Sequence, residues 1–423
     1  MRRLGLALAA LLVLVFPAAA KLTVLAEPPE WRLLDGYQNT VTAAEFAARL
    51  PLFSPNAAIR EYLDLDDRRV VVFADKEKQR RLWELTFAEA EGSAHHNLQA
   101  HTSESIKPQS LVNCDGLTPS LPRPLRGRKI CLDPGHIGGE WANTEERHFR
   151  ARGGPWIDEA ELNFITCRLI EEGLRAAGAT VVWTREELGV PATSRRPPDF
   201  VPEAIAMLWR LEPKARRGDA QLLKRVQWYA ELIFYRVAEI RARARVVEKR
   251  RPDLTLCVHY NALGGQTRYG PKLYKNINRI VLFTHGNYSA TELEFDDMKF
   301  GLFRKLLENS AGTEVAVADA IARRMALAWH YPPEHYDAAI PAGRTPYVQA
   351  RNLLANRLFH GPTVFVEGPF MDDALSYKRL AAGDYDDERV IEGKSYRSIY
   401  REYADTVIQG VIDAIRAGAL SKN

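Results

Sequence analysis

The chain is poor in cysteine, and the spacing of its cysteines excludes one class of metal site. Its 423 residues include four cysteines, Cys114, Cys131, Cys167 and Cys257, and no two of them have the spacing of a zinc ribbon or a CxxC redox pair. Cys131 and Cys257 lie in strand-like runs and Cys167 in a helical one, where small buried thiols are common. We expect structural cysteines. Four cysteines leave room for one disulfide, but the sequence does not pair them.

Beyond the first twenty residues, the chain also lacks a long hydrophobic run. No later stretch has eighteen uncharged apolar residues, so no transmembrane helix is predicted. Residues 1–20 themselves have the features of a signal peptide: Arg2-Arg3, an apolar run from Leu4 to Phe16, and small residues before Lys21. An uncleaved anchor is the alternative, but the apolar run is short for one. We expect a periplasmic or secreted protein without stable membrane insertion after cleavage.

A strong excess of charge of one sign is absent from the chain as a whole. Lys and Arg number 58 and Asp and Glu 54, and the net charge of +4 does not argue for a nucleic-acid partner. The exception is Arg195–Arg251, with 15 basic and 7 acidic residues. Apolar residues recur there every three or four positions, which predicts a long amphipathic helix with basic residues on its outer face. That face is either simply solvated or attracts an anionic polymer.

The remaining pattern predicts two domains. Residues 21–122 are expected to form a small α+β domain of unknown role, with a helix capped at Thr42 and strand-like runs at 60–65, 69–74 and 81–87. A Pro-rich linker follows at about 93–124. Its histidines, His95, His96 and His101, are interpreted as solvated loop residues rather than a metal cluster.

From residue 125 to 423, strands alternate with helices. This pattern predicts an α/β fold in which helices form two layers on either side of a twisted, largely parallel sheet. Insertions are expected at about 187–251 and 286–350. The part of the second insertion from Gly286 to Tyr331 begins with acidic residues, and we expect it to cover part of the cleft and limit activity.

Three short apolar runs in this region end in a residue that can bind metal or transfer protons. Ile130–Leu132 leads to His136, Leu254–Val258 to His259, and Thr363–Val366 to Glu367. Because the carboxyl ends of parallel strands meet at one edge, these three side chains are expected to lie together.

Two histidines and a carboxylate with an open fourth position form a common catalytic zinc shell. The third ligand should come from the helix after the first strand, where Glu159 and Glu161 are both candidates. Zn²⁺ would lower the pKa of a bound water, and Glu367 would then act as general base.

Four motifs in the same chain order resemble the zinc-dependent N-acetylmuramoyl-L-alanine amidases of the amidase_3 type, over residues 128 to 417. They are Leu132–His136, Glu159–Asn163, Asp253–Ala262 and Gly361–Phe370, and Thr184-Arg185 resembles the end of the family's second strand. The resemblance favours Glu159 over Glu161, because Asn163 falls four places after Glu159. It departs from the family at Ile137, where glycine is usual, and in the long insertions.

The resemblance implies cleavage of the amide between N-acetylmuramic acid and L-alanine in peptidoglycan. It implies Zn²⁺ held by His136, Glu159 and His259, with Glu367 as the catalytic residue. It also implies substrate contacts from Arg185 and Asn261, peptidoglycan as partner, and a protein activator as a further partner. No separate organic cofactor is expected. Two alternatives stay open: a non-catalytic peptidoglycan-binding or regulatory protein with an amidase fold, and another zinc peptidase or amidohydrolase.

Overall fold

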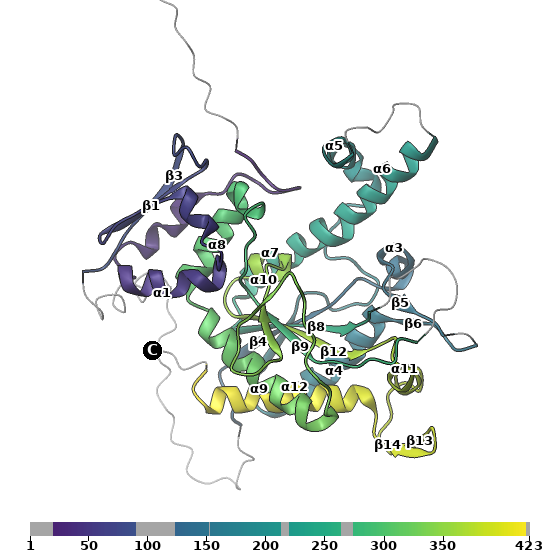
Figure 1. The fold of residues 1–423 in the computed structure, drawn as a ribbon. Coiled ribbons are helices and arrows are strands. Elements are labelled where there is room, and N and C mark those ends of the chain that lie inside the picture. The colour runs from purple at the N-terminus through teal and green to yellow at the C-terminus, as the bar shows by residue number, and fades with distance from the viewer. Residues whose placement is uncertain (1–19, 90–122, 152, 213–219, 264–273, 420–423) are drawn as a thin grey trace, which may run out of the picture.

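The computed structural model describes residues 20–89, 123–151, 153–212, 220–263 and 274–419 (Figure 1). The expectations for the signal peptide, for His95, His96 and His101, and for Cys114 fall on residues outside these ranges.

A seven-stranded mixed sheet forms the centre of the molecule, in the order β10-β11-β9-β12-β8-β4-β7. The strands are β4 (Lys129–Pro134), β7 (Thr180–Trp183), β8 (Leu254–Asn261), β9 (Val281–Thr284), β10 (Ile340–Pro341), β11 (Val348–Ala350) and β12 (Thr363–Phe370). Strands β7, β4, β8 and β12 are parallel neighbours, whereas β9 pairs with β12 in the antiparallel sense. The predicted α/β fold with a largely parallel sheet is confirmed.

Helices cover both faces of this sheet, as expected. One layer contains α4 (Glu159–Ala176), α9 (Ala311–Trp329) and α12 (Ile399–Arg416), and the other contains α7 (Glu239–Arg250) and α10 (Leu354–Leu358) (Figure 1). The apolar residues of the first layer share one core with the buried face of the sheet. The remaining helices and strands are α3 (Ala142–Glu145), α5 (Val201–Leu211), α6 (Ala220–Ile233), α8 (Asp296–Glu308), α11 (Ala374–Ala381), and the hairpins β5–β6 (His148–Phe149, Ile157–Asp158) and β13–β14 (Arg389–Ile391, Lys394–Tyr396).

The N-terminal segment forms a helix and a small antiparallel sheet. They are α1 (Ala43–Phe53), β1 (Leu63–Leu65), β2 (Arg69–Phe73) and β3 (Arg81–Thr86). The predicted cap of α1 is present, because Thr42 Oγ1 accepts from the Glu45 backbone and the Glu45 side chain accepts from the Thr42 backbone. Ala58–Tyr62 is a 3-10 turn rather than the start of a strand, and it buries Ile59 and Tyr62 three residues apart.

The N-terminal segment shares its hydrophobic core with α8. Phe303 of α8 packs against Trp31 and Phe46, and the Arg80 guanidinium lies 2.6 Å from the buried Asp296 carboxylate. In Figure 1, α8 lies beside this purple segment. The domain boundaries predicted from the sequence stay a prediction.

The helices of the Gly286–Tyr331 excursion bury their apolar faces in two hydrophobic cores. Helix α8 packs into the N-terminal core, and α9 packs against α12 and the sheet. The expectation that this excursion covers part of the cleft and limits activity stays a prediction.

The basic Arg195–Arg251 region forms helices, as predicted. Helix α6 continues through a π-helical turn (Phe234–Ala238) into α7, and α5 and α6 project from the body as a hairpin (Figure 1). Ile137, the residue that departs from the family motif, is fully buried in the core of this insertion with Phe200 and Phe234. The large side chain at 137 therefore anchors the inserted helices to the loop after β4.

The described residues contain three free cysteines, and they are buried, as expected for structural thiols: Cys131, Cys167 and Cys257. Among the helices that the structure describes, none is long and apolar enough to cross a membrane.

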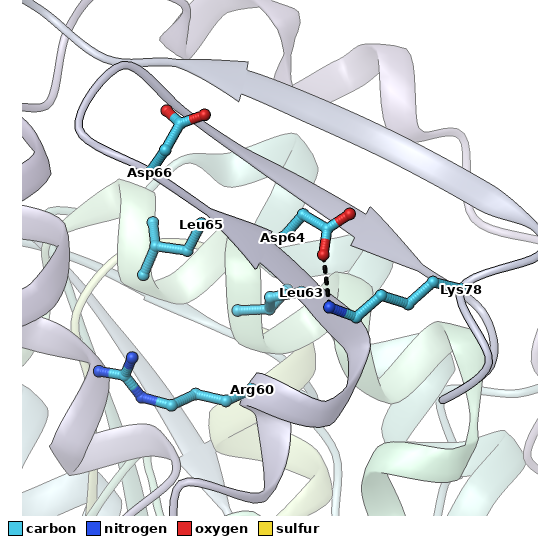
Figure 2. A pocket seen from close by; sticks show the side chains of 6 residues that line it. All are labelled: Arg60, Leu63, Asp64, Leu65, Asp66 and Lys78. Atoms are coloured by element: carbon cyan, nitrogen blue, oxygen red, sulfur yellow. Dashed lines mark hydrogen bonds and ion pairs between the residues drawn. The ribbon is translucent and has the colours of Figure 1, made fainter.

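A small hollow lies at the outer edge of the N-terminal sheet (Figure 2). Its lining includes Arg60 and Asp66, and Lys78 forms an ion pair with Asp64 across it. The hollow combines charges of both signs and contains no histidine or cysteine, so its residues offer no soft metal ligand.

Helices α9 and α12 approach so closely that one position must be glycine. A Cβ on Gly410 of α12 would lie 2.5 Å from the Ile321 Cα of α9. We expect Gly410→Ala to force the helices apart and to lower the free energy of unfolding by about 1–3 kcal/mol, despite alanine's better helix propensity. Urea unfolding followed by circular dichroism measures this.

Gly312→Ala is the matched control, because a Cβ at Gly312 in α9 meets open space. It should leave stability unchanged or slightly raised. Equal effects of the two substitutions would contradict the close packing of α9 on α12.

Candidate metal centre

Three adjacent parallel strands bring the predicted site residues to one edge of the sheet. Strand β8 lies between β4 and β12, and Glu367 of β12 pairs directly with His259 of β8. Because paired residues of neighbouring strands project to the same face, both side chains lie on one side of the sheet. His136 follows the end of β4 by two residues, so the three strand ends do converge as the sequence indicated.

His136, Glu159 and His259 form a compact group of metal-binding side chains. One ligand atom from each lies within 4.8 Å of the others. Glu159 Oε1 lies 3.2 Å from His136 Nε2 and 3.1 Å from His259 Nδ1. The structure thus brings Glu159 into the group, whereas Glu161 is exposed on α4. This group could bind a metal ion.

Glu159 reaches the two histidines from the first turn of α4. Asp158 caps this helix by accepting from the Ala160 amide, and the Glu159 amide donates to the Arg147 carbonyl at 2.9 Å. One turn later, Asn163 Nδ2 donates to the Gly135 carbonyl at 3.1 Å. The four-residue spacing of Glu159 and Asn163 therefore joins the helix both to the ligand group and to the loop that carries His136.

Gly135 is required by the close approach of His259. A Cβ at this position would lie 2.2 Å from the His259 ring. The next residue, His136, has φ +60, a left-handed conformation that is uncommon outside glycine and that needs support from surrounding contacts.

Arg185 and Glu145 provide that support. The Arg185 guanidinium donates to the carbonyls of Pro134 and His136, and Glu145 Oε2 accepts from the amides of Ile137 and Gly138 at 2.8 and 2.9 Å. Glu145 Oε1 also lies 3.5 Å from His136 Nδ1, where it can orient the imidazole.

The sequence-based roles of Arg185 and Asn261 as substrate contacts stay predictions. The Arg185 side chain is 1% exposed and contacts the protein's own backbone and Glu239. Asn261 is buried, and its Nδ2 donates to the Tyr336 hydroxyl at 3.0 Å.

A buried ion-pair network beneath the loop joins it to the inserted helix α7. Arg243 Nη1 lies 3.1 Å from Asp133 Oδ1, and Thr184 Oγ1 donates to the same oxygen at 2.5 Å. Glu239 of α7 lies 3.3 Å from Arg185 Nε. Burial lowers the pKa of Arg243, but the charges of Asp133 and Glu239 raise it by more than burial lowers it. Arg243 therefore stays charged. The expectation that the basic residues of this helix lie on its outer face is thus wrong for Arg243, because its charge is needed beside Asp133.

The charges of the ligand group stabilise one another. Burial lowers the pKa of His136, but Glu159 and Glu145 outweigh it and raise this pKa to about 9. Burial raises the pKa of Glu159, yet the two imidazoles hold it well below its usual range. Burial also lowers the pKa of His259. An anionic carboxylate with two imidazoles is a donor set that suits a divalent cation such as Zn²⁺.

The pKa of Glu367 is shifted in the opposite direction from that of Glu159. Burial, followed by the nearby Glu159 charge, raises the pKa of Glu367 to about 8, and Arg147 and Arg351 partly oppose this rise. A cation bound at the ligand group would also lower the pKa of Glu367. A carboxyl group that titrates near neutral pH is suited to exchange protons with a substrate.

The sequence did not identify several residues around this site. Glu145, Arg147, Arg351 and Tyr336 belong to no recognisable local pattern, and the amphipathic pattern around Arg243 did not single this residue out. The only sequence signal available was the presence of long insertions beside the motifs.

Replacing Arg243 by methionine would leave the Asp133 charge buried without its cation. We expect Arg243→Met to reduce the free energy of unfolding by about 3–5 kcal/mol. Adding Asp133→Asn removes the stranded charge, so the double variant should recover a large part of that loss. Chemical denaturation of the three variants provides the test, and a double variant less stable than Arg243→Met would contradict the pairing.

The sequence matches no protein-family model and no curated protein. Among solved structures, the chain is similar to the N-acetylmuramyl-L-alanine amidase Ami1 of Mycobacterium smegmatis, with 15% identity over 69% of this chain and 99% of that chain and a TM-score of 0.37. It is also similar to the CwlD amidase of Clostridioides difficile, solved with the GerS lipoprotein (12% identity, 69% and 100% of the two chains, TM-score 0.38). AmiC2 of Nostoc punctiforme gives 12% identity, 69% and 98% coverage, and a TM-score of 0.36. Likeness at this level carries no functional argument, and the case for a function rests on the geometry of the site.

Proposed function

We propose that this protein is a zinc-dependent N-acetylmuramoyl-L-alanine amidase of the amidase_3 type. Its substrate would be the amide between N-acetylmuramic acid and L-alanine in peptidoglycan. One observation carries the proposal: His136, Glu159 and His259 converge within 4.8 Å at the sheet edge where the half-buried Glu367 lies in register with His259. The four sequence motifs supply the choice of substrate.

His136, Glu159 and His259 would hold the metal. Zn²⁺ bound there would act as a Lewis acid that polarises the scissile carbonyl and activates water. The protein has already arranged the three ligands, because Glu145, Arg185 and Asn163 hold the His136 loop. Such contacts from outside the ligand set fix the orientation of the ligands.

Glu367 would act as the general base and then as the general acid. Its carboxylate takes a proton from the water that attacks the scissile carbonyl carbon. When the C–N bond breaks, Glu367 returns a proton to the leaving nitrogen of L-alanine, which departs as an amine. The Tyr403 hydroxyl donates to the carbonyls of His259 and Val366 at 3.0 and 2.9 Å, which keeps the strands of the base and the ligand in register.

Arg147 would place positive charge beside the reacting group. It is half-buried, its carbonyl accepts from the Glu159 amide, and its charge acts on Glu367. A cation near the reacting group would favour the negative charge that develops on the carbonyl oxygen.

The proposed substrate lies outside the cytoplasmic membrane, in agreement with the signal peptide predicted from the sequence. We therefore propose a periplasmic or secreted location, peptidoglycan as partner, and a protein activator as a further partner. A non-catalytic wall-binding protein would bind sacculi without releasing stem peptide, and another zinc peptidase would release different fragments.

The choice of ligands can be tested with two glutamates of the same helix. We expect purified wild type to contain one zinc ion per chain by elemental analysis. Glu159→Gln should lose most of this zinc because the bridging carboxylate is gone, whereas Glu161→Gln should retain it because Glu161 is exposed. If Glu159→Gln kept stoichiometric zinc, the assigned ligand set would be wrong.

The role of Glu367 predicts a separation of chemistry from metal binding. Glu367→Gln should lower kcat on purified peptidoglycan by about 10²–10⁴-fold while zinc content stays at the wild-type value. Mass spectrometry of the wild-type products should find the intact stem peptide freed from the glycan. Products cut within the peptide would instead identify a peptidase, and full activity of Glu367→Gln would exclude Glu367 as the base.

A further inference from the structure

Arg351 directly follows strand β11. The proposed mechanism assigns no step to this residue. The Arg351 amide donates to the Thr284 carbonyl of β9 at 3.0 Å. Its guanidinium lies over two aromatic rings, 5.7 Å from the centroid of Phe283 and 5.5 Å from that of Tyr336. These stacking contacts fix the position of a charged group that would otherwise be free to rotate.

Tyr336 connects Arg351 to the candidate metal centre. Its hydroxyl accepts a hydrogen bond from Asn261, which stands two residues after His259 on β8. Burial raises the pKa of Tyr336, the Glu367 charge raises it further, and the Arg351 charge lowers it, so both charges act on the Tyr336 hydroxyl. Phe283 in turn packs on Phe365, whose ring stacks on His259 at 4.2 Å. A row of contacting rings, of which Phe283 is buried, therefore connects His259 to Arg351.

Within the described ranges of the chain, no carboxylate forms an ion pair with the Arg351 guanidinium, although its charge acts on Glu367 over a longer distance. Other half-buried arginines do have one: Arg401 contacts Asp384, and Arg304 contacts Glu308. A half-buried cation fixed on aromatic rings without an acidic partner is suited to bind an anionic group from outside, and guanidinium binds carboxylates with two parallel hydrogen bonds.

Arg351 also lines a polar cavity of about 610 Å³. The cavity lies between the N-terminal segment, which contributes Asn56, and the catalytic part of the chain, which contributes Asn287, Asn352 and Asp337. Its Glu292 carboxylate is already occupied by Ser289 and Asn352. Amide side chains beside a guanidinium and the exposed Asp337 carboxylate are suited to a peptide, whose backbone offers donors and acceptors.

The pairing of β9 with β12 and with β11 gives the separation of Arg351 from Glu367. Val281 of β9 pairs with Glu367, and Thr284, three residues later, pairs with Ala350, the residue before Arg351. Because β9 runs antiparallel to β12, the Arg351 backbone lies about four residues from Glu367 towards the amino end of β12, roughly 13 Å at about 3.3 Å per residue. An extended peptide covers this span in about four residues, and fewer are needed because the Arg351 side chain turns back towards Tyr336.

We propose that Arg351, held by Tyr336 and Phe283, binds a carboxylate of the peptide part of the substrate, two to four residues from the scissile amide. Arg351 is a specificity-determining residue and takes no part in bond breaking. The inference rests on the proposed function, since it names the part of that substrate which this cavity binds.

Two matched substrates test the inference: an N-acetylmuramoyl tripeptide with a free carboxylate on its third residue, and the same compound with a carboxamide there. Wild type should hydrolyse the free acid with a KM about tenfold or more below that of the amide, at similar kcat. Arg351→Gln should raise the KM for the acid to the value for the amide. Because Arg351 also lowers the pKa of Glu367, any change in kcat should be the same for both substrates. Arg351→Lys should keep part of the preference because it retains the charge.

Binding without turnover provides the second readout. Calorimetry with Glu367→Gln should find tighter binding of the acid than of the amide, and the additional Arg351→Gln substitution should abolish the difference. Arg323→Gln, an exposed arginine of α9, is the control and should change neither value. If wild type cleaves both substrates with equal KM, or Arg351→Gln and Arg351→Lys both keep the preference, the inference is wrong and the proposed function stands. If wild type cleaves neither substrate nor peptidoglycan, the proposed function itself fails.

Discussion

The contact of the buried Glu159 carboxylate with two imidazoles is the interaction on which this site depends. A carboxylate that is almost fully buried is costly unless it is paired, and here His136 and His259 provide the partners at 3.2 and 3.1 Å. The three residues come from the end of β4, the start of α4 and the end of β8, so the pairing requires all of these elements to be in register. The same arrangement is the donor set of a divalent metal, and folding and metal binding therefore place the same demands on this part of the chain.

The inserted helices support this arrangement from below and are part of the fold of the site. Arg243 of α7 neutralises Asp133 at the end of β4, and Glu239 of α7 contacts Arg185, which holds the carbonyls of the His136 loop. Ile137 buries its side chain in the core of the insertion instead of leaving a small residue after the ligand. Ile137 is therefore accounted for by the Arg195–Arg251 insertion, whose core its side chain completes. A glycine at 137 would remove the contact between the loop and the inserted helices.

The sequence predicted the parts of the structure that depend on local patterns. The buried strands at His136, His259 and Glu367, the capped helix at Thr42 and the helix bearing Glu159 were all readable from apolar spacing and end signals. The contacts made by long insertions were not readable, because Arg243 pairs with Asp133 across 110 positions and no local periodicity encodes such a pair. For the same reason the basic helix was expected to place its cations outward, and the hydrophobic cores that α8 and α9 complete were not predicted. Arg351 and Tyr336 escaped notice because neither residue belongs to a distinctive local pattern, and only the fold brings the guanidinium over the Tyr336 ring.

X-ray absorption spectroscopy at the zinc edge of the purified, metal-loaded protein tests the central claim most directly, because it reports the ligand atoms of the bound ion. We expect nitrogen and oxygen atoms around the zinc ion, with the scattering signature of two imidazoles. No sulfur should be detected, because the buried Cys131, Cys167 and Cys257 lie outside the ligand group. In a variant with His259→Ala, the imidazole signal should fall by half or the zinc should be lost. A sulfur ligand, or an imidazole count unaffected by His259→Ala, would contradict the metal centre described for His136, Glu159 and His259.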